Sequence, residues 1–588
     1  MHNPWISLIR AVWQHGKPWH RAIAGYYIAY IVAQGLMSLS PYAFGKAIGL
    51  LQHFSQGSFR ELLFWLIFGV LLVPLFWLFH GPARVVERKV ALRIQQSFRL
   101  KIFADMTRLP LKWHQDHHSG HLVTRVNRAA TALHRFAEDQ FIYIETVVKF
   151  IVSVGFLLWI SLPVGLVSLV SCSLATWVVF AFDRKLIPLY ESENETDNQV
   201  GALFFDYLNN MTTILTLRLG KLTEKSLIKR ILSIWPVFNQ EVVLNEVKWF
   251  AMGITLSALQ SAILIGYIVW HLENFDAVLV GTVVMIFRYQ WDLSEVFYNF
   301  SANYSDLVRK DTDIRGVQPI LDDIHAHALM PVDIDCASSW QTLEIADLNF
   351  HHPGSKRSGS LEGLHFTLQR GEKIALIGTS GAGKSTLMNL LSGLYHPDSV
   401  RLRMDNHTFA NLVPLQALTT LIPQEPEIFE NTIAFNIALG LETSSEELLQ
   451  AVKLAGFSEV LSTLPQGLET DIREKGVNLS VGQKQRLALA RGLFAARFSS
   501  LVLMDEPTSS VDLAAEKAIL TGVMERFRDA TMLVSLHRLH LLPQFDRVIC
   551  LSHGKIIADG ATADLLNTEG PVRDVWQKYQ SHRRSGRV

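Results

Sequence analysis

One stretch decides the fold of the second half of the chain: Gly378-Thr379-Ser380-Gly381-Ala382-Gly383-Lys384-Ser385-Thr386. It matches G-x-x-x-x-G-K-[ST], the motif of a loop that binds nucleotide phosphates. The apolar run 373–377 before it predicts a buried strand, and 387–391 after it predicts the start of a helix. In that context, backbone N–H groups and the helix N-terminus surround phosphate oxygens. We therefore expect Lys384 to reach the terminal phosphates and Ser385 to place its hydroxyl on Mg²⁺; the alternative is a chance glycine-rich turn.

A second apolar run, 501–504, ends in two carboxylates, Asp505 and Glu506. A buried strand of this kind would deliver Asp505 to the Mg²⁺ shell through water. It would also deliver Glu506 to the attacking water as a general base. The two runs together predict a site that hydrolyses a nucleotide, and they make a chance glycine-rich turn at 378–386 a poor explanation.

The composition indicates more than one domain. The chain has 588 residues, 49% of them hydrophobic and 18% charged, and the long apolar runs lie in the first half. The formal net charge is zero, so nothing suggests a nucleic-acid partner. The three cysteines, Cys172, Cys336 and Cys550, are far apart and have no metal-ligand spacing, so we expect reduced thiols. We also expect no cleavable signal peptide.

Six apolar stretches are long enough to cross roughly 30 Å of hydrocarbon. They cover approximately 22–44, 61–80, 146–162, 163–182, 249–272 and 276–298. The third and fourth are separated only by a predicted tight turn at 161–163. The second and third, and also the fourth and fifth, are separated by about 65 residues of helix-forming sequence. We therefore predict six transmembrane helices, two of which are followed by long extensions outside the membrane.

The distribution of basic residues predicts the orientation. Lysine and arginine crowd both long connections, whereas the short connections carry little beyond Arg60. By the positive-inside rule, the long connections, the N-terminus and the C-terminal half face the cytoplasm. The sequence therefore predicts a multi-pass integral membrane protein surrounded by membrane lipid. We expect this membrane to be a bacterial inner (plasma) membrane.

Arg288, Asp292 and Glu295 lie at i, i+4 and i+7 in the sixth stretch. Charged residues inside a span usually face the bundle interior or a wet cavity. Two interpretations stay open: a charge cluster where the helix has already left the lipid, or a polar lining of a transport pathway.

We expect a transmembrane domain over 1–325, a polar linker over 326–340 and an α/β domain with a parallel sheet over 341–580.

At this point the chain resembles the ATP-binding cassette (ABC) family. The residues from Leu479 to Gln483 resemble the signature L-S-G-G-Q, with Val481 in place of its first glycine, and 485–491 match the Q-R-x-x-x-A-R helix after it. Gln424 occupies the Q-loop position and His537 that of the switch histidine. The stretch 509–512, ending at Asp512, resembles the D-loop. His352 stands where the family has its adenine-stacking aromatic.

The resemblance implies a P-loop ABC ATPase domain fused to six helices of the exporter branch, called type IV. It implies that the nucleotide lies between the phosphate loop of one chain and Ser480, Gly482 and Gln483 of another, with ATP and Mg²⁺ bound. It implies Glu506 and His537 as catalytic residues. Further nucleotide-binding residues would be His352, Gly378, Thr379, Ser380, Gly381, Ala382, Gly383, Lys384, Ser385, Thr386, Gln424 and Asp512, with Ser385, Gln424 and Asp505 at Mg²⁺.

The exporter branch also implies partners and a coupling mechanism. One site needs two chains, so we expect a symmetric homodimer or a pair with a paralogous half-transporter. The stretch 109–122 is similar to the family's segment leading into the first coupling helix, and the second coupling helix should fall near 209–213. The resemblance implies that these helices pass the movement of the ATPase domains to the membrane helices. The resemblance implies ATP-driven, alternating-access export of a hydrophobic or amphipathic compound, drug or lipid, with the substrate itself left open.

Two departures from the family pattern bear on activity. Val481 removes a signature glycine, but Ser480 and Gly482 keep the groups that contact the γ-phosphate. His352 offers less ring area to adenine than tyrosine does. The alternatives to an exporter are an ATP-gated channel or regulator of the same architecture, whose relatives tend to have one degraded site, and a soluble-type ABC ATPase.

A cluster of four histidines has the pattern H-x-x-H-H-x-x-H: His114, His117, His118 and His121. It is either a metal site or a polar turn near the first coupling helix.

Overall fold

The computed structural model describes all residues except 1–3, 53, 118, 276–277, 328–339, 353–359, 426, 473–478, 509–510 and 585–588. The chain divides into two compact units. The first holds Met1–Leu109 and His114–Ala328, and the second holds Pro110–Trp113 and Leu329–Val588. We call them the membrane unit and the nucleotide unit. The predicted linker 326–340 falls largely outside the described residues.

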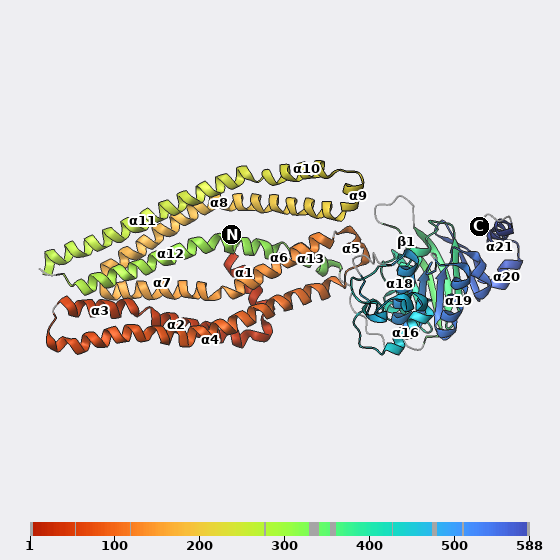
Figure 1. Ribbon diagram of the computed structural model, residues 1–588, viewed down its shortest axis with the longest axis horizontal. Helices are drawn as coiled ribbons and strands as arrows, with labels where there is room; N and C mark the ends of the chain where they lie inside the picture. The colour runs from red at the N-terminus through yellow and green to blue at the C-terminus, as the bar shows by residue number, and fades with distance from the viewer. Residues whose placement is uncertain are drawn as a thin grey trace. The chain divides into compact units, whose positions relative to one another are not determined.

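The first part of the chain is helical (Figure 1). Its helices are α1 (Pro4–His15), α2 (His20–Met37), α3 (Ser40–Gln52), α4 (Phe59–Met106), α5 (Leu111–Asp116), α6 (Ser119–Glu138), α7 (Gln140–Ile160), α8 (Leu162–Asn209), α9 (Met211–Thr216), α10 (Gly220–Leu232), α11 (Trp235–Phe275), α12 (Val280–Arg315) and α13 (Gln318–His327).

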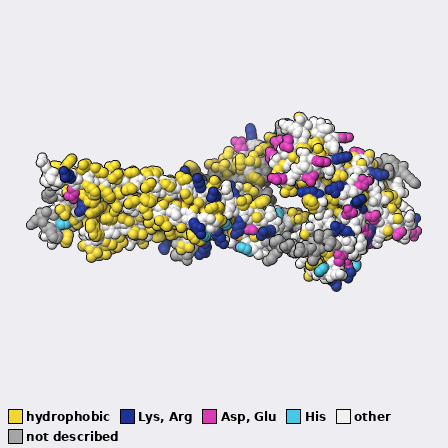
Figure 2. Space-filling view, turned by 90° about the horizontal axis from the view of Figure 1, so that it is seen from below, with side chains coloured by type: hydrophobic (Ala, Val, Ile, Leu, Met, Phe, Trp, Pro, Cys, Tyr) yellow, Lys and Arg dark blue, Asp and Glu magenta, His cyan; other side chains and the backbone are white. Residues whose placement is uncertain are grey.

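Among the described residues, five helical stretches are long and apolar enough to cross a membrane: Lys17–Gln52, Gln56–Met106, Gln140–Ile160, Leu162–Asn209 and Gly220–Asn274. In the most apolar segment of Gln56–Met106, only 11% of the residues are buried inside the protein. Most of its apolar side chains therefore face outward, where lipid chains can surround them. Figure 2 shows hydrophobic side chains covering much of one face of this unit. The sixth predicted span lies in α12, which is not among the five and carries Arg288, Asp292 and Glu295, so it stays a prediction.

Several helices are much longer than a membrane is thick, and α4 and α8 are the longest of those described. α4 and α8 each have 48 residues, which at the usual rise is about 72 Å, more than twice the hydrocarbon thickness. Both therefore continue well beyond the lipid, as the long connections predict. α7 ends at Ile160 and α8 begins at Leu162, so a tight turn lies where 161–163 predicts one, but it is shorter than predicted because Leu162 and Pro163 already belong to α8. Short helices α5 and α9 follow the far ends of α4 and α8.

The nucleotide unit holds two sheets. A four-stranded sheet has the order β2-β1-β4-β5, and a six-stranded sheet has the order β10-β9-β3-β8-β7-β6. The strands are β1 (Thr342–Phe350), β2 (Leu361–Gln369), β3 (Lys373–Gly378), β4 (Ser399–Met404), β5 (His407–Phe409), β6 (Thr419–Ile422), β7 (Leu501–Asp505), β8 (Thr531–Ser535), β9 (Arg547–Ser552) and β10 (Lys555–Ala561).

The larger sheet is parallel except for its edge strand β10. Parallel strands are covered on both faces, which is why β7 and β8 are apolar runs with every residue buried. Two hydrophobic clusters cover the two faces: one contains Ile377, Val502 and Val534, and the other contains Leu376 and Leu503. The described helices of this unit are α14 (Lys384–Leu391), α15 (Ile433–Ala438), α16 (Ser445–Leu454), α17 (Ser458–Thr463), α18 (Val481–Ala495), α19 (Leu513–Arg526), α20 (Thr562–Asn567) and α21 (Pro571–Arg584).

Candidate nucleotide site

The phosphate loop connects the carboxyl end of β3 to the N-terminus of α14, as its motif predicts. Gly383 stands directly before α14 with φ +103°, a conformation that L side chains rarely adopt, and an added Cβ would lie 2.6 Å from Leu361 Cδ2. Lys384 is the first helical residue. Its ammonium donates to the carbonyl oxygens of Gly378 (3.0 Å) and Thr379 (3.4 Å). The loop therefore holds its one cation directly over its own backbone, where it can meet a phosphate.

The two carboxylates lie at the same edge of the sheet. Asp505 is the last residue of β7, it is 7% exposed, and it pairs with Ser535 of β8, the strand between β7 and β3. Because these strands are parallel, Asp505 and the phosphate loop both lie at the carboxyl ends, where open α/β sheets bind ligands. Glu506 follows with φ +46°, a strained conformation for a residue with a side chain.

Two glutamines hold Glu506 in place. Gln424, which lies two residues after β6, donates from Nε2 to Glu506 Oε2 at 2.8 Å. Gln485 of α18 donates from Nε2 to the backbone oxygen of Glu506 at 3.2 Å. The first contact joins two residues that the sequence assigns to the site separately. The second was not predicted, since Gln485 stands out in the sequence only as part of the helix after the signature.

The predicted adenine-stacking residue lies beside the phosphate-binding helix. His352 Nε2 is 3.4 Å from Thr386 Oγ1, and its ring packs edge-on against Phe350 (4.8 Å) and Tyr395 (5.6 Å). Phe350 and Tyr395 are themselves stacked at 5.6 Å. The sequence does not predict that Tyr395 belongs to the site, because the position of Tyr395 beside His352 depends on the packing of β1 against the segment after α14. The next residues, 353–359, lie outside the described part of the chain.

The signature residues form the start of α18. Ser480 is its N-cap, with its hydroxyl accepting from Gln483 N (3.3 Å) while Gln483 Oε1 accepts from Ser480 N (2.8 Å). This reciprocal capping box fixes both side chains at a helix N-terminus, which favours anions. Val481 is 68% exposed. Among the described residues, no hydrogen bond joins Ser480, Gly482 or Gln483 to the phosphate loop of the same chain.

Asp512 caps α19, and its Oδ1 accepts from the backbone N–H groups of Ala515 (2.9 Å) and Ala514 (3.1 Å). These hydrogen bonds hold the pKa of Asp512 below its ordinary value. The buried Glu516 in the same helix accepts from Thr508 Oγ1 (2.8 Å) and pairs with Arg538 (3.3 Å). Sequence reasoning did not single out Glu516. Ser509 and Ser510 of the D-loop lie outside the described residues.

His537 follows β8 by two residues and is exposed. The structure brings it to the same edge of the sheet as Asp505, but no hydrogen bond joins it to Glu506 or to another described residue. Its neighbour Arg538 donates to Val511 O at 2.7 Å, which links the segment after β8 to the D-loop. The catalytic role of His537 therefore stays a prediction.

Arg491 ties α18 to the segment that follows Gln424. Its guanidinium donates to Asn436 O (2.6 Å), Asn436 Oδ1 (2.8 Å) and Glu427 O (2.7 Å), and lies over the ring of Phe429 at 4.9 Å. Asn436 is fully buried. Its side-chain amide accepts a hydrogen bond from the backbone N–H of Phe429 and donates one to the backbone oxygen of the same residue. These contacts join the signature helix to the segment after Gln424 within this unit.

The oxygen donors expected at Mg²⁺ have suitable chemistry. Ser385, Gln424 and Asp505 offer a hydroxyl, an amide and a carboxylate, the hard ligands that Mg²⁺ takes together with waters and phosphates. Asp505 is buried at the sheet edge and has no described cation partner in a salt bridge. That unbalanced buried carboxylate fits a cation at this edge.

The histidine cluster gains no support as a metal site. Within the described part of the chain, no group of three or more His, Cys, Asp or Glu residues could hold a metal ion. His114 Nε2 lies 3.1 Å from Met106 O, and His117 lies 3.9 Å from Asp323. His118 and the side chain of His121 lie outside the described residues. Cys172 and Cys550 are free and buried, and Cys336 also lies outside.

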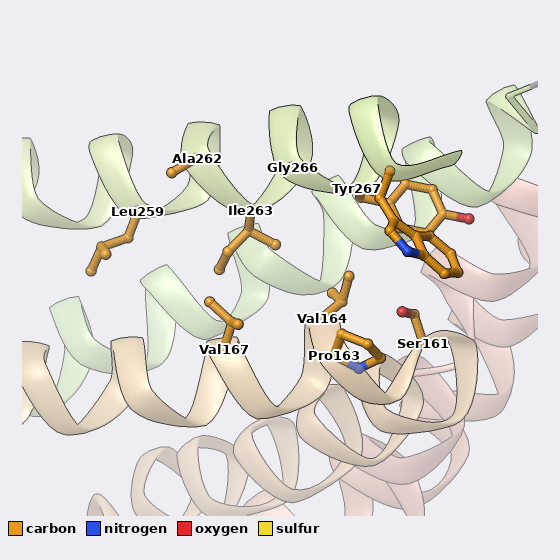
Figure 3. A pocket seen from close by; sticks show the side chains of 10 residues that line it. Ser161, Pro163, Val164, Val167, Leu259, Ala262, Ile263, Gly266 and Tyr267 are labelled. Atoms are coloured by element: carbon orange, nitrogen blue, oxygen red, sulfur yellow. The ribbon is translucent and has the colours of Figure 1, made fainter. Parts of the chain in front are cut away.

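A crevice of about 280 Å³ lies between α8 and α11 in the membrane unit. Figure 3 shows Val164 and Val167 of α8 pointing toward Leu259 and Ile263 of α11 across it. An added Cβ on Gly266, also in its wall, would meet nothing within 4 Å. Its walls are mostly apolar, and Ser161, Tyr267 and Trp270 supply the polar atoms at one end (Figure 3).

Two family models match the chain. The model described as "ABC transporter" matches residues 361–509, and the model described as "ABC transporter transmembrane region" matches residues 23–267. The first match contains the phosphate loop, Gln424, the signature and both carboxylates. The second contains the five apolar helical stretches almost entirely.

Curated relatives agree with these models. The chain is 27% identical to an ATP-dependent lipid A-core flippase of Dechloromonas aromatica, covering 86% of each chain. It is 24% identical to an ATM1-type heavy metal exporter of Novosphingobium aromaticivorans, covering 85% of this chain and 82% of that one. The chain is also 27% identical to the ATP-binding cassette sub-family B member 6 of Mesocricetus auratus. This match covers 83% of the present chain but only 58% of the length of that relative.

A solved structure has the same fold. The structure of a bacterial Atm1-family ABC exporter with ATP bound superposes with a TM-score of 0.78. The match covers 95% of this chain and 98% of that chain at 22% sequence identity.

Proposed function

Because this chain belongs to the ATP-binding cassette transporter family, we propose that it is an ATP-driven membrane exporter. The observation that carries the proposal is the joining of two features in one chain. A phosphate loop with Lys384 lies at the sheet edge that also presents Asp505 and a Glu506 held by Gln424. The same chain contributes five apolar helical stretches, which argue against a soluble ATPase.

The residues have distinct roles in this proposal. Loop 378–386 and the N-terminus of α14 bind the phosphates, with Lys384 neutralising the terminal ones. Ser385, Gln424 and Asp505 would hold Mg²⁺, which when bound neutralises charge that develops on the phosphates. Glu506 accepts a proton from the attacking water, and Gln424 fixes the carboxylate for that task. His352 contacts the adenine, and His537 approaches the γ-phosphate.

The working unit in this proposal is a dimer. Each chain has one phosphate loop and one signature, and Ser480 makes no described hydrogen bond to its own loop. A second chain would bring Ser480, Gly482, Gln483 and the dipole of α18 to the γ-phosphate from the opposite side. Asp512 would lie at the same contact. A symmetric homodimer would supply the second signature from a copy of the same chain and would form two equal sites.

The direction and location follow from the sequence and the relatives. Fusion of membrane and ATPase parts in one chain favours export, and two relatives are named a flippase and an exporter. Basic residues in the long connections favour a cytoplasmic nucleotide unit, and the bacterial relatives support a bacterial inner membrane as the location. ATP binding closes the paired nucleotide units, and hydrolysis resets them.

The test is Glu506→Gln in the full-length protein reconstituted in lipid vesicles. The amide keeps the volume of the side chain but cannot accept a proton, so we expect ATPase activity to fall at least about a hundredfold. ATP binding should persist, because Lys384 and the loop are unchanged. Near-normal ATPase activity in this variant would contradict the role given to Glu506.

A further inference from the structure

The buried carboxylate of Glu516, on α19, contacts both segments that carry the proposed catalytic residues. Glu516 is 3% exposed. Its Oε1 accepts a hydrogen bond at 2.8 Å from Thr508 Oγ1, two residues after Glu506. Its Oε2 lies 3.3 Å from Arg538 Nη1, one residue after His537. One side chain therefore joins the segment after β7 to the segment after β8.

The position of Glu516 is fixed by the first turn of α19. Its backbone N–H donates to Asp512 O at 2.8 Å, and the Asp512 carboxylate caps the same turn. Thr508 is also buried, and its backbone oxygen accepts from Val511 N at 3.1 Å. The Glu516 carboxylate therefore has a defined position from which it can hold its partners.

Arg538 fixes the chain on one side of His537. Its Nη1 donates to Val511 O at 2.7 Å, in addition to its contact with the buried carboxylate. On the other side of His537, the backbone N–H of Leu536 donates to Leu376 O of β3 at 3.1 Å. The backbone at His537 is therefore held from both sides, while the side chain itself is exposed.

Burial makes the contacts of Glu516 depend on one another. A carboxylate that is out of water must be paired, and its hydrogen bonds to charged donors are the strong ones. Oε2 meets Arg538 and lies 3.6 Å from His540 Nε2, while Oε1 meets Thr508. Movement of either segment would leave part of the carboxylate unpaired. The segments after β7 and β8 should therefore keep one relative placement.

We propose that Glu516 is a positioning residue for ATP hydrolysis. Through Thr508 it sets the placement of Glu506. Through Arg538 it sets the placement of His537. The inference rests on the proposed roles of Glu506 and His537, and it adds a residue that acts only through others. Because small displacements of a reacting group slow catalysis strongly, loss of the Glu516 carboxylate should slow hydrolysis without weakening ATP binding.

Glu516→Gln tests this role in the full-length protein reconstituted in lipid vesicles. The amide keeps the volume and can still accept from Thr508, but its NH₂ group would face Arg538, donor against donor. We expect the kcat of ATP hydrolysis, counted per site that binds a fluorescent ATP analogue, to fall at least about tenfold. KM should stay within about twofold. The control Glu525→Gln, which neutralises an exposed carboxylate of the same helix, should change neither constant.

Counting per ATP-binding site separates positioning from folding. If Glu516 only stabilises α19, misfolded chains lose ATP binding and activity together, so kcat per site stays normal. A fall in kcat per site with unchanged KM supports the proposal. Normal kcat per site, or a change confined to KM, would overturn it.

A double variant tests the route through Arg538. Arg538→Gln removes the guanidinium and should also lower kcat per site. If Glu516 acts through Arg538, the variant with both substitutions should be at most about twofold slower than the slower single variant. Effects that multiply would mean that the two side chains act independently, and they would overturn the proposed placement of His537 by Glu516.

Thr508→Val tests the second route, because valine keeps the shape of threonine and removes the hydroxyl. We expect kcat per site to fall about three- to tenfold, as for the loss of one buried hydrogen bond, with KM unchanged. Thr521→Val, which removes an exposed hydroxyl that bonds within α19, is the control and should leave both constants unchanged. Normal kcat in Thr508→Val would overturn the proposed placement of Glu506 by Glu516.

Glu506→Gln, measured in the same assay, separates this inference from the proposed function. Slow turnover in both Glu506→Gln and Glu516→Gln supports both. An inactive Glu506→Gln beside a normal Glu516→Gln would overturn the inference and leave the proposed function standing. Near-normal activity in Glu506→Gln would contradict the proposed function, and with it the part of the inference that runs through Thr508.

Discussion

At the scale of single residues, the nucleotide site separates binding from chemistry. Lys384 donates to two carbonyl oxygens of its own loop, whereas Glu506 is held by Gln424 through its carboxylate. In the proposed function, the lysine would supply a fixed positive charge to the phosphates and the glutamate would supply the base. Substitutions at the two positions should therefore fail in different ways, although both lie at one edge of the sheet.

Lys384→Ala should weaken ATP binding as well as hydrolysis. A charge-assisted hydrogen bond is worth about 1.5–3 kcal/mol, which corresponds to roughly a ten- to hundredfold loss of affinity. The measurement is equilibrium binding of a fluorescent ATP analogue to the full-length protein. The control is Lys555→Ala, which removes an exposed lysine of β10 that pairs with Glu362 of β2, and this variant should bind normally. Unchanged affinity in the Lys384 variant would mean that the loop is not the site.

At the scale of elements, α18 connects three parts of the site. Its N-terminus presents Ser480, Gln485 holds the backbone of Glu506, and Arg491 holds Asn436 and Glu427 in the segment after Gln424. A shift of this helix would therefore move the signature, the general base and the Q-loop segment together. That arrangement suits a domain whose signature would have to contact the nucleotide bound by a partner chain.

Arg491→Lys should lower turnover with little change in nucleotide affinity. Lysine keeps the charge, but it cannot reproduce the fork that reaches two residues at once. We expect the kcat of ATP hydrolysis to fall about three- to tenfold while KM stays within about twofold. Arg497→Lys, beyond the end of the same helix, is the control and should leave both constants unchanged. A change confined to KM would contradict the coupling role.

Several elements could be predicted from local pattern. β3 and β7 are short apolar runs bounded by a glycine loop or by carboxylates, and the tight turn at Ser161 lies between two apolar stretches. The contacts that complete the site could not be predicted in this way. The hydrogen bond between Gln424 and Glu506 spans 82 residues, and Tyr395 reaches His352 only through tertiary packing. The sixth span is ambiguous because α12 mixes apolar residues with charges that pair across to α7.

At the scale of the whole molecule, the chain has the parts of a site but not a complete one. The phosphate loop and the capped N-terminus of α18 both suit an anion, yet no described hydrogen bond joins them within one chain. A second chain in head-to-tail orientation would place each α18 against the other's loop. In the proposed dimer, the five apolar stretches would keep both chains in one membrane, which would raise their effective concentration for this contact.

Disulfide formation between Ser480→Cys and Ser380→Cys tests that arrangement. Cys172, Cys336 and Cys550 are first replaced by alanine or serine, so that only introduced thiols react. Two chains with different tags, one carrying each substitution, are then produced together. Since a disulfide requires Cα atoms within about 7 Å, a bond between the tagged chains reports direct apposition of signature and loop.

We expect a covalent dimer that contains both tags, with a yield that changes when ATP is added, because the nucleotide lies between the two positions. Each single-substitution chain produced alone is the control and should give little of this product. In a chain carrying both substitutions, the bond should again form between chains. A bond found only within one chain would mean that Ser480 meets its own phosphate loop. In that case a single chain would complete its site, and the argument for a dimeric ATPase would be wrong.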